Sequence, residues 1–120
     1  PCQEVDVQVE QYKSEVAKSM SERDLQSNVI DCAGKLGYTL IYHTWSSVHS
    51  PGGFPDLVLC RPSDGRCLYI ELKSERGKLT TSQVEWLEGL HACGQETYLF
   101  RPSEWISGRV EEVLRGTHAE

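Results

Sequence analysis

The stretch that decides the fold runs from Gly52 to Gln83 and reads GGFPDLVLCRPSDGRCLYIELKSERGKLTTSQ. It holds two apolar runs, at residues 57–60 and 68–72, separated by the polar segment RPSDGR. The Asp64-Gly65 pair is typical of a tight turn between two strands. The stretch is therefore predicted to form an antiparallel β-hairpin.

Three charged side chains, Asp56, Glu71 and Lys73, lie inside or beside these apolar runs. Strand side chains alternate between the two faces of a sheet, so Glu71 and Lys73 point the same way. A turn centred between Ser63 and Asp64 places Asp56 opposite Glu71, with β-carbons about 5 Å apart. A turn centred one residue later places Asp56 opposite Lys73. Either register gathers the three side chains at one end of the hairpin.

Two carboxylates that face each other repel, and both stay ionised at neutral pH only if a cation compensates them. Mg²⁺ suits such a pair, because it takes oxygen ligands and prefers one or two carboxylates together with a substrate phosphate. A neighbouring ammonium group can orient or deprotonate a water molecule, or stabilise charge that develops on the phosphate. The pattern predicts hydrolysis of a phosphodiester. The alternative is an ordinary Glu-x-Lys pair on a solvated strand, which the surrounding apolar residues disfavour.

The rest of the chain predicts a central mixed sheet flanked by helices, in the order helix, strand, strand, strand, helix, strand, helix. Residues 1–20 have both strand-like and helix-like spacing, and we favour a helix in this N-terminal extension. The main domain is placed at residues 21–115 and a tail at 116–120. The domain is predicted to begin with a helix that is capped by Ser21 and ended by Gly37, followed by a strand in YTLIYHTW and the hairpin. The next helix is capped by Thr80 and Gln83, ends at Gly94, and turns Val84, Leu87 and Leu90 inward. A strand in TYLFR, parallel to the Glu71 strand, then leads to a last helix that is capped by Ser103 and bears Ile106, Val110, Val113 and Leu114.

Composition places the chain among ordinary globular proteins. Its 120 residues suit one domain, and 38% hydrophobic with 25% charged residues is a typical balance. No apolar run approaches the roughly 20 residues of a membrane span. The polar start PCQEVDVQVEQYK has no secretory signal, so a cytoplasmic location is expected. The five cysteines have no metal-ligand spacing, and Cys60 with Cys67 is expected to be a reduced pair close in space. The net charge of −6 argues against a general nucleic-acid coating protein but allows a metal-dependent nuclease.

Pro55-Asp56 followed by Glu71-Leu72-Lys73 resembles the motif of PD-(D/E)XK nucleases. The wider pattern GFPDLVL … YIELKSERGKLTTSQVEWLEGLHACG is similar to the VRR-NUC subgroup, in which a Gly-x-Pro-Asp entry, a Glu-x-Lys strand and a Gly-x-Leu-Thr-x-x-Gln helix start follow in this order. The match runs from about Ser21 to Leu114 and leaves residues 1–20 outside. It implies a restriction-endonuclease-like α/β fold.

The resemblance also implies roles for individual residues. Asp56 and Glu71 become ligands of Mg²⁺ or Mn²⁺, with the Leu72 carbonyl as a further ligand, and Lys73 becomes the catalytic lysine. Gln83 matches a glutamine that supports the site in the family, although simple capping of its helix is the alternative. An acidic or amide residue of the first helix commonly joins the metal, and here Glu22 and Gln26 are the two candidates. No organic cofactor is implied.

DNA contacts are predicted from the loop after the Glu-x-Lys strand and from the loop after YHTW. Arg76 and Lys78 are candidates for phosphate contacts, with a solvated loop as the alternative. Relatives often carry basic residues between the two serines of the second loop, whereas here Ser47 and Ser50 enclose Val48 and His49. His43 and His49 are weaker phosphate candidates. Trp45, Trp86 and Trp105 are candidates for stacking on bases, with core packing or a dimer contact as the stronger expectation for the last two.

The function expected from this resemblance is metal-dependent cleavage of DNA, with branched or otherwise structured DNA as substrate and a homodimer as the active form, because two symmetric cuts call for two sites related by a twofold axis. Small members of the subgroup resemble phage or bacterial proteins, which suggests a bacterial cell or a phage-infected host. The alternatives are a monomeric nicking or flap-type nuclease, and a non-catalytic nucleic-acid-binding module that keeps the fold. Retention of all three charged residues disfavours the module.

Overall fold

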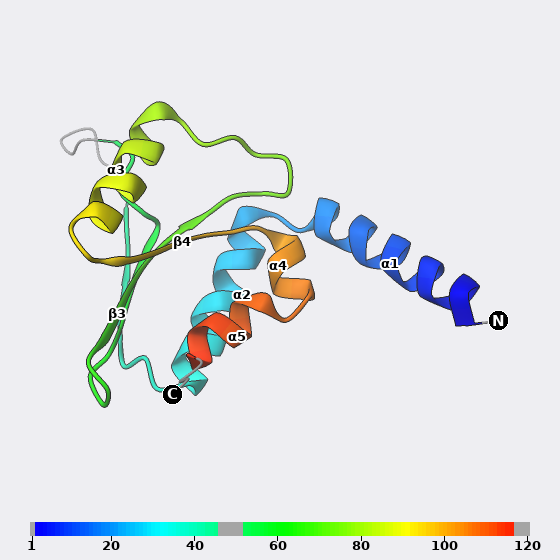
Figure 1. Ribbon diagram of the computed structural model, residues 1–120, viewed down its shortest axis with the longest axis horizontal. Helices are drawn as coiled ribbons and strands as arrows, with labels where there is room; N and C mark the ends of the chain where they lie inside the picture. The colour runs from blue at the N-terminus through cyan, green and yellow to red at the C-terminus, as the bar shows by residue number, and fades with distance from the viewer. Residues whose placement is uncertain (1, 46–51, 117–120) are drawn as a thin grey trace.

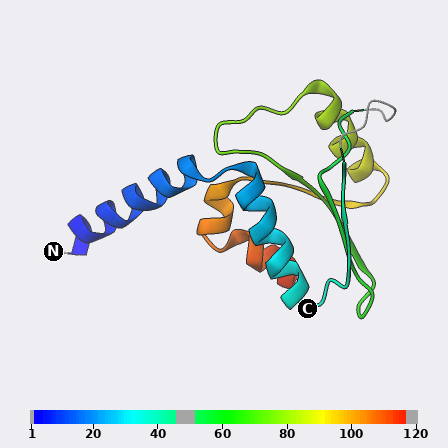
Figure 2. The same cartoon turned by 180° about the vertical axis from the view of Figure 1, so that it is seen from behind.

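The arrangement of helices and strands is seen in a computed structural model that describes residues 2–45 and 52–116, with the side chains of residues 2–4 left out. In chain order the elements are α1 (Cys2–Ser19), α2 (Glu22–Lys35), β1 (Leu40–His43), β2 (Leu57–Arg61), β3 (Arg66–Leu72), α3 (Thr81–Ala92), β4 (Glu96–Phe100), α4 (Pro102–Ile106) and α5 (Arg109–Arg115). Helix α3 covers one face of the sheet, and α2, α4 and α5 lie on the other (Figure 1, and from behind in Figure 2). This confirms the predicted α/β fold with a mixed sheet between helices.

The sheet has the strand order β1-β2-β3-β4. Strands β1, β2 and β3 are antiparallel neighbours, and β4 runs parallel to β3, as expected for a βαβ connection through α3. In the hairpin, Leu57 pairs with Ile70 and Arg61 pairs with Arg66. The turn is therefore centred between Ser63 and Asp64, the first of the two registers predicted from the sequence.

The hydrophobic core fills the space between the sheet and helices α2 and α5. Its members share one face of the strands or the inward side of a helix and are at most 1% exposed, apart from Val113 at 7%. They are Leu57, Leu59, Leu68, Ile70, Leu72 and Phe100 from the sheet, Leu25, Val29 and Ala33 from α2, Tyr38, and Val110, Val113 and Leu114 from α5. Residues 57–60 of β2 alternate between buried and half-buried, so only one face of this strand is fully covered.

Helix starts follow the predicted capping signals. The Ser21 hydroxyl accepts a hydrogen bond from the Asp24 N–H at 3.0 Å, which satisfies one of the free donors at the start of α2. The last turn of α2 gives way to Gly37, whose φ of 94° lies in the left-handed region. Thr80 and Gln83 form a reciprocal capping box at the start of α3.

Helix α3 is less buried than the sequence suggests. Val84, Leu87 and Leu90 were predicted to face inward, but each is only half-buried, and α3 has no buried residue. Trp86 on this helix is 37% exposed. The reason is that α3 lies alone on its face of the sheet, so no second helix covers its flanks (Figure 1).

The predicted last helix is two helices. The cap was expected at Ser103, but Arg101 is the N-cap and Pro102 the first residue of α4, a position at which proline costs no hydrogen bond. Helix α4 ends at Ile106, and α5 starts at Arg109 after Gly108, which has φ 88°. A glycine in the left-handed region breaks the helix and lets α5 turn its apolar side toward the core.

Helix α1 projects away from the rest of the molecule (Figures 1 and 2). Its C-terminal half is anchored, where Ala17 is 2% exposed and the helix packs against α4. Val5, Val7 and Tyr12 are each more than half exposed. Of the two alternatives for the N-terminal extension, the structure has the helix. Within the described ranges, no helix is both long and apolar enough to cross a membrane.

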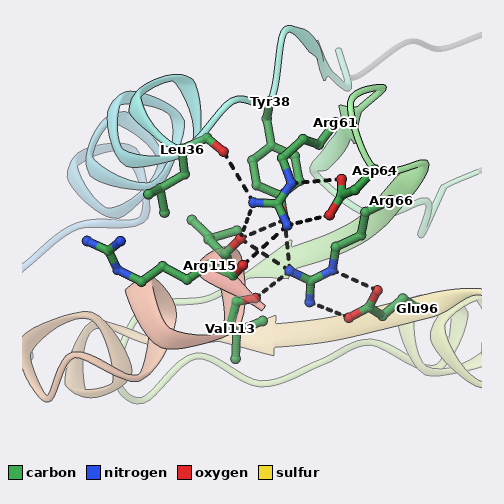
Figure 3. A network of polar contacts seen from close by, with 9 residues as sticks. Leu36, Tyr38, Arg61, Asp64, Arg66, Glu96, Val113 and Arg115 are labelled. Carbon is green, nitrogen blue, oxygen red and sulfur yellow. Dashed lines mark hydrogen bonds and ion pairs between the residues drawn. The ribbon is translucent and has the colours of Figure 1, made fainter. Parts of the chain in front are cut away.

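Two arginines tie the turn of the hairpin to the ends of helices α2 and α5 (Figure 3). Arg61 donates to the Leu36 carbonyl at 3.2 Å and to the Leu114 carbonyl at 3.1 Å, and its guanidinium forms two 2.9 Å hydrogen bonds with Asp64. Arg66 donates to the Leu114 carbonyl at 3.2 Å. Carbonyls at a helix C-terminus lack partners within the helix and carry partial negative charge, so a cation there is favourable. This contact fixes the far end of the hairpin and thereby its register.

Cys60 and Cys67 are directly opposed on β2 and β3, with their sulfur atoms 3.5 Å apart. Both are free thiols, as are Cys32 and Cys93. Burial is the main cause that raises the pKa of the Cys67 thiol, and Cys60 adds to it. The expected closeness of the two cysteines is confirmed.

Candidate active site

The candidate site lies at the end of the hairpin opposite the turn, where β2 begins and β3 ends. The last paired residues there are Leu57 and Ile70. Continuing the same register by one step sets Asp56 across from Glu71. The alternative register, with Asp56 opposite Lys73, is excluded.

Asp56 is held from three sides. Its Oδ2 accepts a hydrogen bond from the Leu72 N–H at 2.8 Å. Its backbone carbonyl accepts from the Thr44 N–H at 2.9 Å, and the Thr44 hydroxyl donates to the Pro55 carbonyl at 2.7 Å. These contacts fix both the backbone and one carboxylate oxygen. The Asp56 carboxylate is therefore oriented before any ligand arrives.

Glu71 is buried, with 2% of its surface exposed. Its Oε2 accepts a hydrogen bond from Gln83 Nε2 at 3.1 Å, whereas its Oε1 is buried and has no hydrogen-bond partner among the described residues. The pKa of Glu71 is raised from 4.5 to about 8, mainly by burial and next by the adjacent Asp56 carboxylate, while Lys73 opposes the rise. A buried carboxylate oxygen without a partner needs a proton or a cation.

Gln83 makes the contacts that each of the two roles weighed for it would need. Its Oε1 accepts from the Thr80 N–H at 2.9 Å and so caps α3. Its Nε2 donates to Glu71. Capping holds the amide in one orientation, and this orientation presents the donor to the carboxylate. The capping box thus also positions Glu71.

Lys73 follows directly after β3 and continues the strand, since its N–H donates to the Phe100 carbonyl at 3.1 Å. Its side chain is half-buried and packs under the loop of residues 74–79. A β-carbon at Gly77 would lie 2.9 Å from Ser74 Oγ and 3.4 Å from Lys73 Cδ, so the backbone of the loop passes close to the Lys73 side chain.

Arg101 fastens this loop. One of its guanidinium nitrogens donates to the Ser74 carbonyl at 2.8 Å and to the Gly77 carbonyl at 2.6 Å. A charged donor held by two carbonyls gives stronger hydrogen bonds than a neutral one. Sequence reasoning missed this residue. The signal was the parallel pairing of β3 with β4, since the register that pairs Leu72 with Phe100 brings Arg101 beside Lys73.

Both residues weighed on the first helix of the domain reach this site. Glu22 and Gln26 line a cavity of about 360 Å³ together with Asp56 and Leu72. Glu22 also accepts a long hydrogen bond, 3.4 Å, from the Ser74 N–H, and its charge adds to the rise of the Glu71 pKa. Glu22 is therefore electrostatically part of the acid cluster, whereas Gln26 borders only its cavity.

The donor set fits a hard divalent cation. Two carboxylates and a backbone carbonyl are oxygen ligands of the kind that Mg²⁺ takes, with water and substrate completing its shell. Across the described ranges, no three His, Cys, Asp or Glu side chains cluster closely enough to enclose a metal ion on their own. The arrangement resembles an open site more than a structural cage. The partnerless Oε1 of Glu71 is the atom that such a cation would satisfy.

The family model of the VRR-NUC domain matches residues 3–103. The chain belongs to the VRR-NUC family. The match includes α1, which the sequence resemblance left outside, and stops at the first turn of α4. As a VRR-NUC protein, the chain is of a nuclease type, and DNA is the substrate that this domain suggests.

Two solved structures are similar to this VRR-NUC chain. One, described as a VRR_NUC domain, has a TM-score of 0.54 at 20% identity and covers 72% of this chain and 94% of its own. The other, a VRR_NUC domain protein, has a TM-score of 0.55 at 18% identity and covers 81% of this chain and 91% of its own. At such identities the likeness concerns the fold alone. No curated protein matches the chain.

Those predicted DNA-contacting residues that the structure describes lie in two places. Arg76 and Lys78 are exposed on the loop that carries Lys73. His43 lies on the other side of the site and lines the cavity beside Asp56. Ser47, His49 and Ser50 lie outside the described residues.

Proposed function

We propose that this VRR-NUC protein is a Mg²⁺- or Mn²⁺-dependent DNA endonuclease that hydrolyses phosphodiester bonds. The observation that carries the proposal is the opposed Asp56 and Glu71 pair, with one carboxylate oxygen of Glu71 buried and left without a partner. A protein gains no stability from such an atom, since an unsatisfied buried polar group costs about 1–3 kcal/mol. Its retention is understandable if a cation binds there.

Asp56, Glu71 and the Leu72 carbonyl would hold the metal ion. When bound, the ion supplies a Lewis acid that polarises the phosphate and offsets its negative charge. Gln83 keeps Glu71 turned toward Asp56. The Lys73 ammonium orients or deprotonates the attacking water, or stabilises the charge that develops on the phosphate.

The Lys73 loop also offers contacts for the DNA backbone. Arg76 and Lys78 are exposed there and would bind phosphates on either side of the cleaved bond. Such a local basic segment can act within an acidic protein, because phosphate contacts depend on nearby charge rather than on the net charge of −6.

We propose branched or structured DNA as substrate and a homodimer as the active form. The dimer proposal is supported by the open side of α3, where Trp86 is 37% exposed and a groove of about 400 Å³ runs past Leu90 and Cys93. An apolar surface of this kind is commonly used to pair subunits. A twofold axis there would give two sites for two strands.

The test is incubation with labelled single-stranded, duplex, flap and four-way DNA in Mg²⁺ or Mn²⁺, with EDTA as control. We expect cleavage that requires the metal, is strongest on flap or four-way DNA, and is lost in Asp56→Asn. The exposed Glu88 on α3 offers a matched control, and Glu88→Gln should cleave normally. Cleavage that persists in EDTA, or an Asp56→Asn variant as active as the wild type, would refute the proposal. Light scattering after size exclusion reads the oligomeric state.

A further inference from the structure

The cavity of about 360 Å³ beside Asp56 extends from the acid pair onto the side of the sheet that carries α2. Its wall is formed by Glu22, Arg23 and Gln26 of α2, His43 and Trp45 from the end of β1, and Asp56 with Leu72. This volume falls at the lower end of the range of ligand-binding pockets. Because Asp56 belongs both to the acid pair and to this wall, a group bound in the cavity lies next to the proposed site of cleavage.

Among the described residues, Trp45 is the most exposed large hydrophobic residue, at 75%. Its ring centroid lies 5.2 Å from that of His43, with the ring planes inclined at 41°. The contact with His43 supports the indole while leaving most of its surface in water. An indole held open at the mouth of a cavity is the feature by which single-stranded nucleic acids are bound, since every base offers a flat face for stacking.

The wall of the cavity carries charges of both signs, with Glu22 and Asp56 acidic and Arg23 basic. Arg23 and Gln26 add side-chain donors, and an amide such as that of Gln26 can pair with the edge of adenine. The cavity therefore combines a stacking surface with hydrogen-bonding groups for a base edge.

We propose that this cavity is a nucleobase subsite, in which Trp45 stacks on an unpaired base adjacent to the cleaved phosphate. The proposal rests on the proposed nuclease function. In a continuous duplex both faces of a base are covered by its neighbours, so the subsite selects DNA whose bases are unpaired at the cut. It would make Trp45 a residue that determines specificity for flaps, junctions and single strands.

The test compares Trp45→Ala, Trp45→Phe and the wild type on a flap oligonucleotide and on abasic versions lacking single bases next to the cleaved bond. We expect Trp45→Ala to lose about 5- to 150-fold in kcat/KM, the factor that stacking of one base is worth. Removal of the stacked base should cost the wild type a similar factor and leave Trp45→Ala unaffected. Trp45→Phe should retain most of the activity.

Tyr42→Ala is the matched control, because Tyr42 is an aromatic residue, 57% exposed, on the strand that ends two residues before Trp45, and it does not line the cavity. It should behave as the wild type. A Trp45→Ala variant that cleaves normally, or that responds to the abasic sites as the wild type does, overturns the subsite.

Binding of the same oligonucleotides in EDTA, measured by fluorescence anisotropy, separates the subsite from the nuclease proposal. If the wild type cleaves no substrate, the nuclease proposal fails while the binding comparison still decides the subsite. Weaker binding by Trp45→Ala than by the wild type, with no further loss on abasic DNA, supports the nucleobase subsite. Equal binding by Trp45→Ala and the wild type refutes the subsite.

Discussion

Replacing Glu71 by glutamine should stabilise the metal-free protein, and the gain should grow with pH. Glu71 has a pKa of about 8 in the folded protein, against 4.5 when unperturbed. Between these two values the folded state binds more protons than the unfolded state, so stability falls as pH rises through this window and levels off above it. One pKa unit is worth about 1.4 kcal/mol, which sets the cost of the ionised form at up to about 5 kcal/mol.

Glu71→Gln keeps the shape of the side chain and the acceptor for Gln83 but removes the charge. The assay is urea unfolding in EDTA, followed by tryptophan fluorescence at pH 5, 7 and 9. We expect the two proteins to be similar at pH 5, and the variant to be more stable by a few kcal/mol at pH 9. Glu88→Gln, exposed on α3, should follow the wild type. If Glu71→Gln and wild type lose stability in parallel from pH 5 to pH 9, the burial argument is wrong.

Addition of Mg²⁺ tests the ligand assignment in the same experiment. A ligand that binds only the folded state at 100 times its Kd stabilises it by about 2.7 kcal/mol. Mg²⁺ should therefore stabilise the wild type at pH 9 and have little effect on Glu71→Gln. Equal stabilisation of both proteins would place the ion elsewhere.

The remaining predictions concern the loop that carries Lys73. Lys73→Ala should abolish cleavage while leaving folding, measured by circular dichroism, and DNA binding, measured by fluorescence anisotropy, nearly unchanged. Lys73→Arg should recover activity only if the charge alone is needed. Full activity in Lys73→Ala would remove the residue from the mechanism. Arg101→Met should release the loop and lower kcat on the order of 10-fold or more, with little change in KM. Arg109 is an exposed arginine of α5, and Arg109→Met should have no effect. A normal kcat in Arg101→Met would show that the loop does not need to be held by this side chain. Replacing Arg76 and Lys78 by glutamine should reduce the slope of log K against log salt by about 0.9 for each lost contact with duplex DNA, and an unchanged slope would move the DNA path away from this loop.

The two ends of the hairpin are built in opposite ways. At the turn, Arg61 and Arg66 bind helix carbonyls and acids, so each charge there has a partner. At the open end, Asp56 and Glu71 oppose each other, and Oε1 of Glu71 has no hydrogen-bond partner in the part of the chain that the structure describes. The contacts of Arg61 and Arg66 at the turn hold the strands in register, and their stabilisation offsets the cost of the opposed Asp56 and Glu71 carboxylates at the other end.

Sequence reasoning worked best where neighbours along the chain decide the outcome. The Asp64-Gly65 turn predicted the hairpin and limited its register to two alternatives, of which the structure has the first, and the Thr80–Gln83 spacing predicted the capping box. It was wrong about the last helix, although Gly108 within that segment was a visible warning. It also overestimated the burial of α3, because helical spacing gives the apolar side of a helix but not the area available to cover it.

By itself, the sequence determined the hairpin, most of the order of helices and strands, and the gathering of the two acids and the lysine at one end of the hairpin, because turn chemistry, alternation and capping act over a few residues. It left two registers of the hairpin open, and the tertiary structure decided between them. Only the tertiary structure decided which groups lack partners and which are held. The orphaned oxygen of Glu71, the grip of Arg101 on the Lys73 loop and the open indole of Trp45 each depend on segments far apart in the chain. Burial and long-range hydrogen bonds are properties of packing, and no local pattern encodes them.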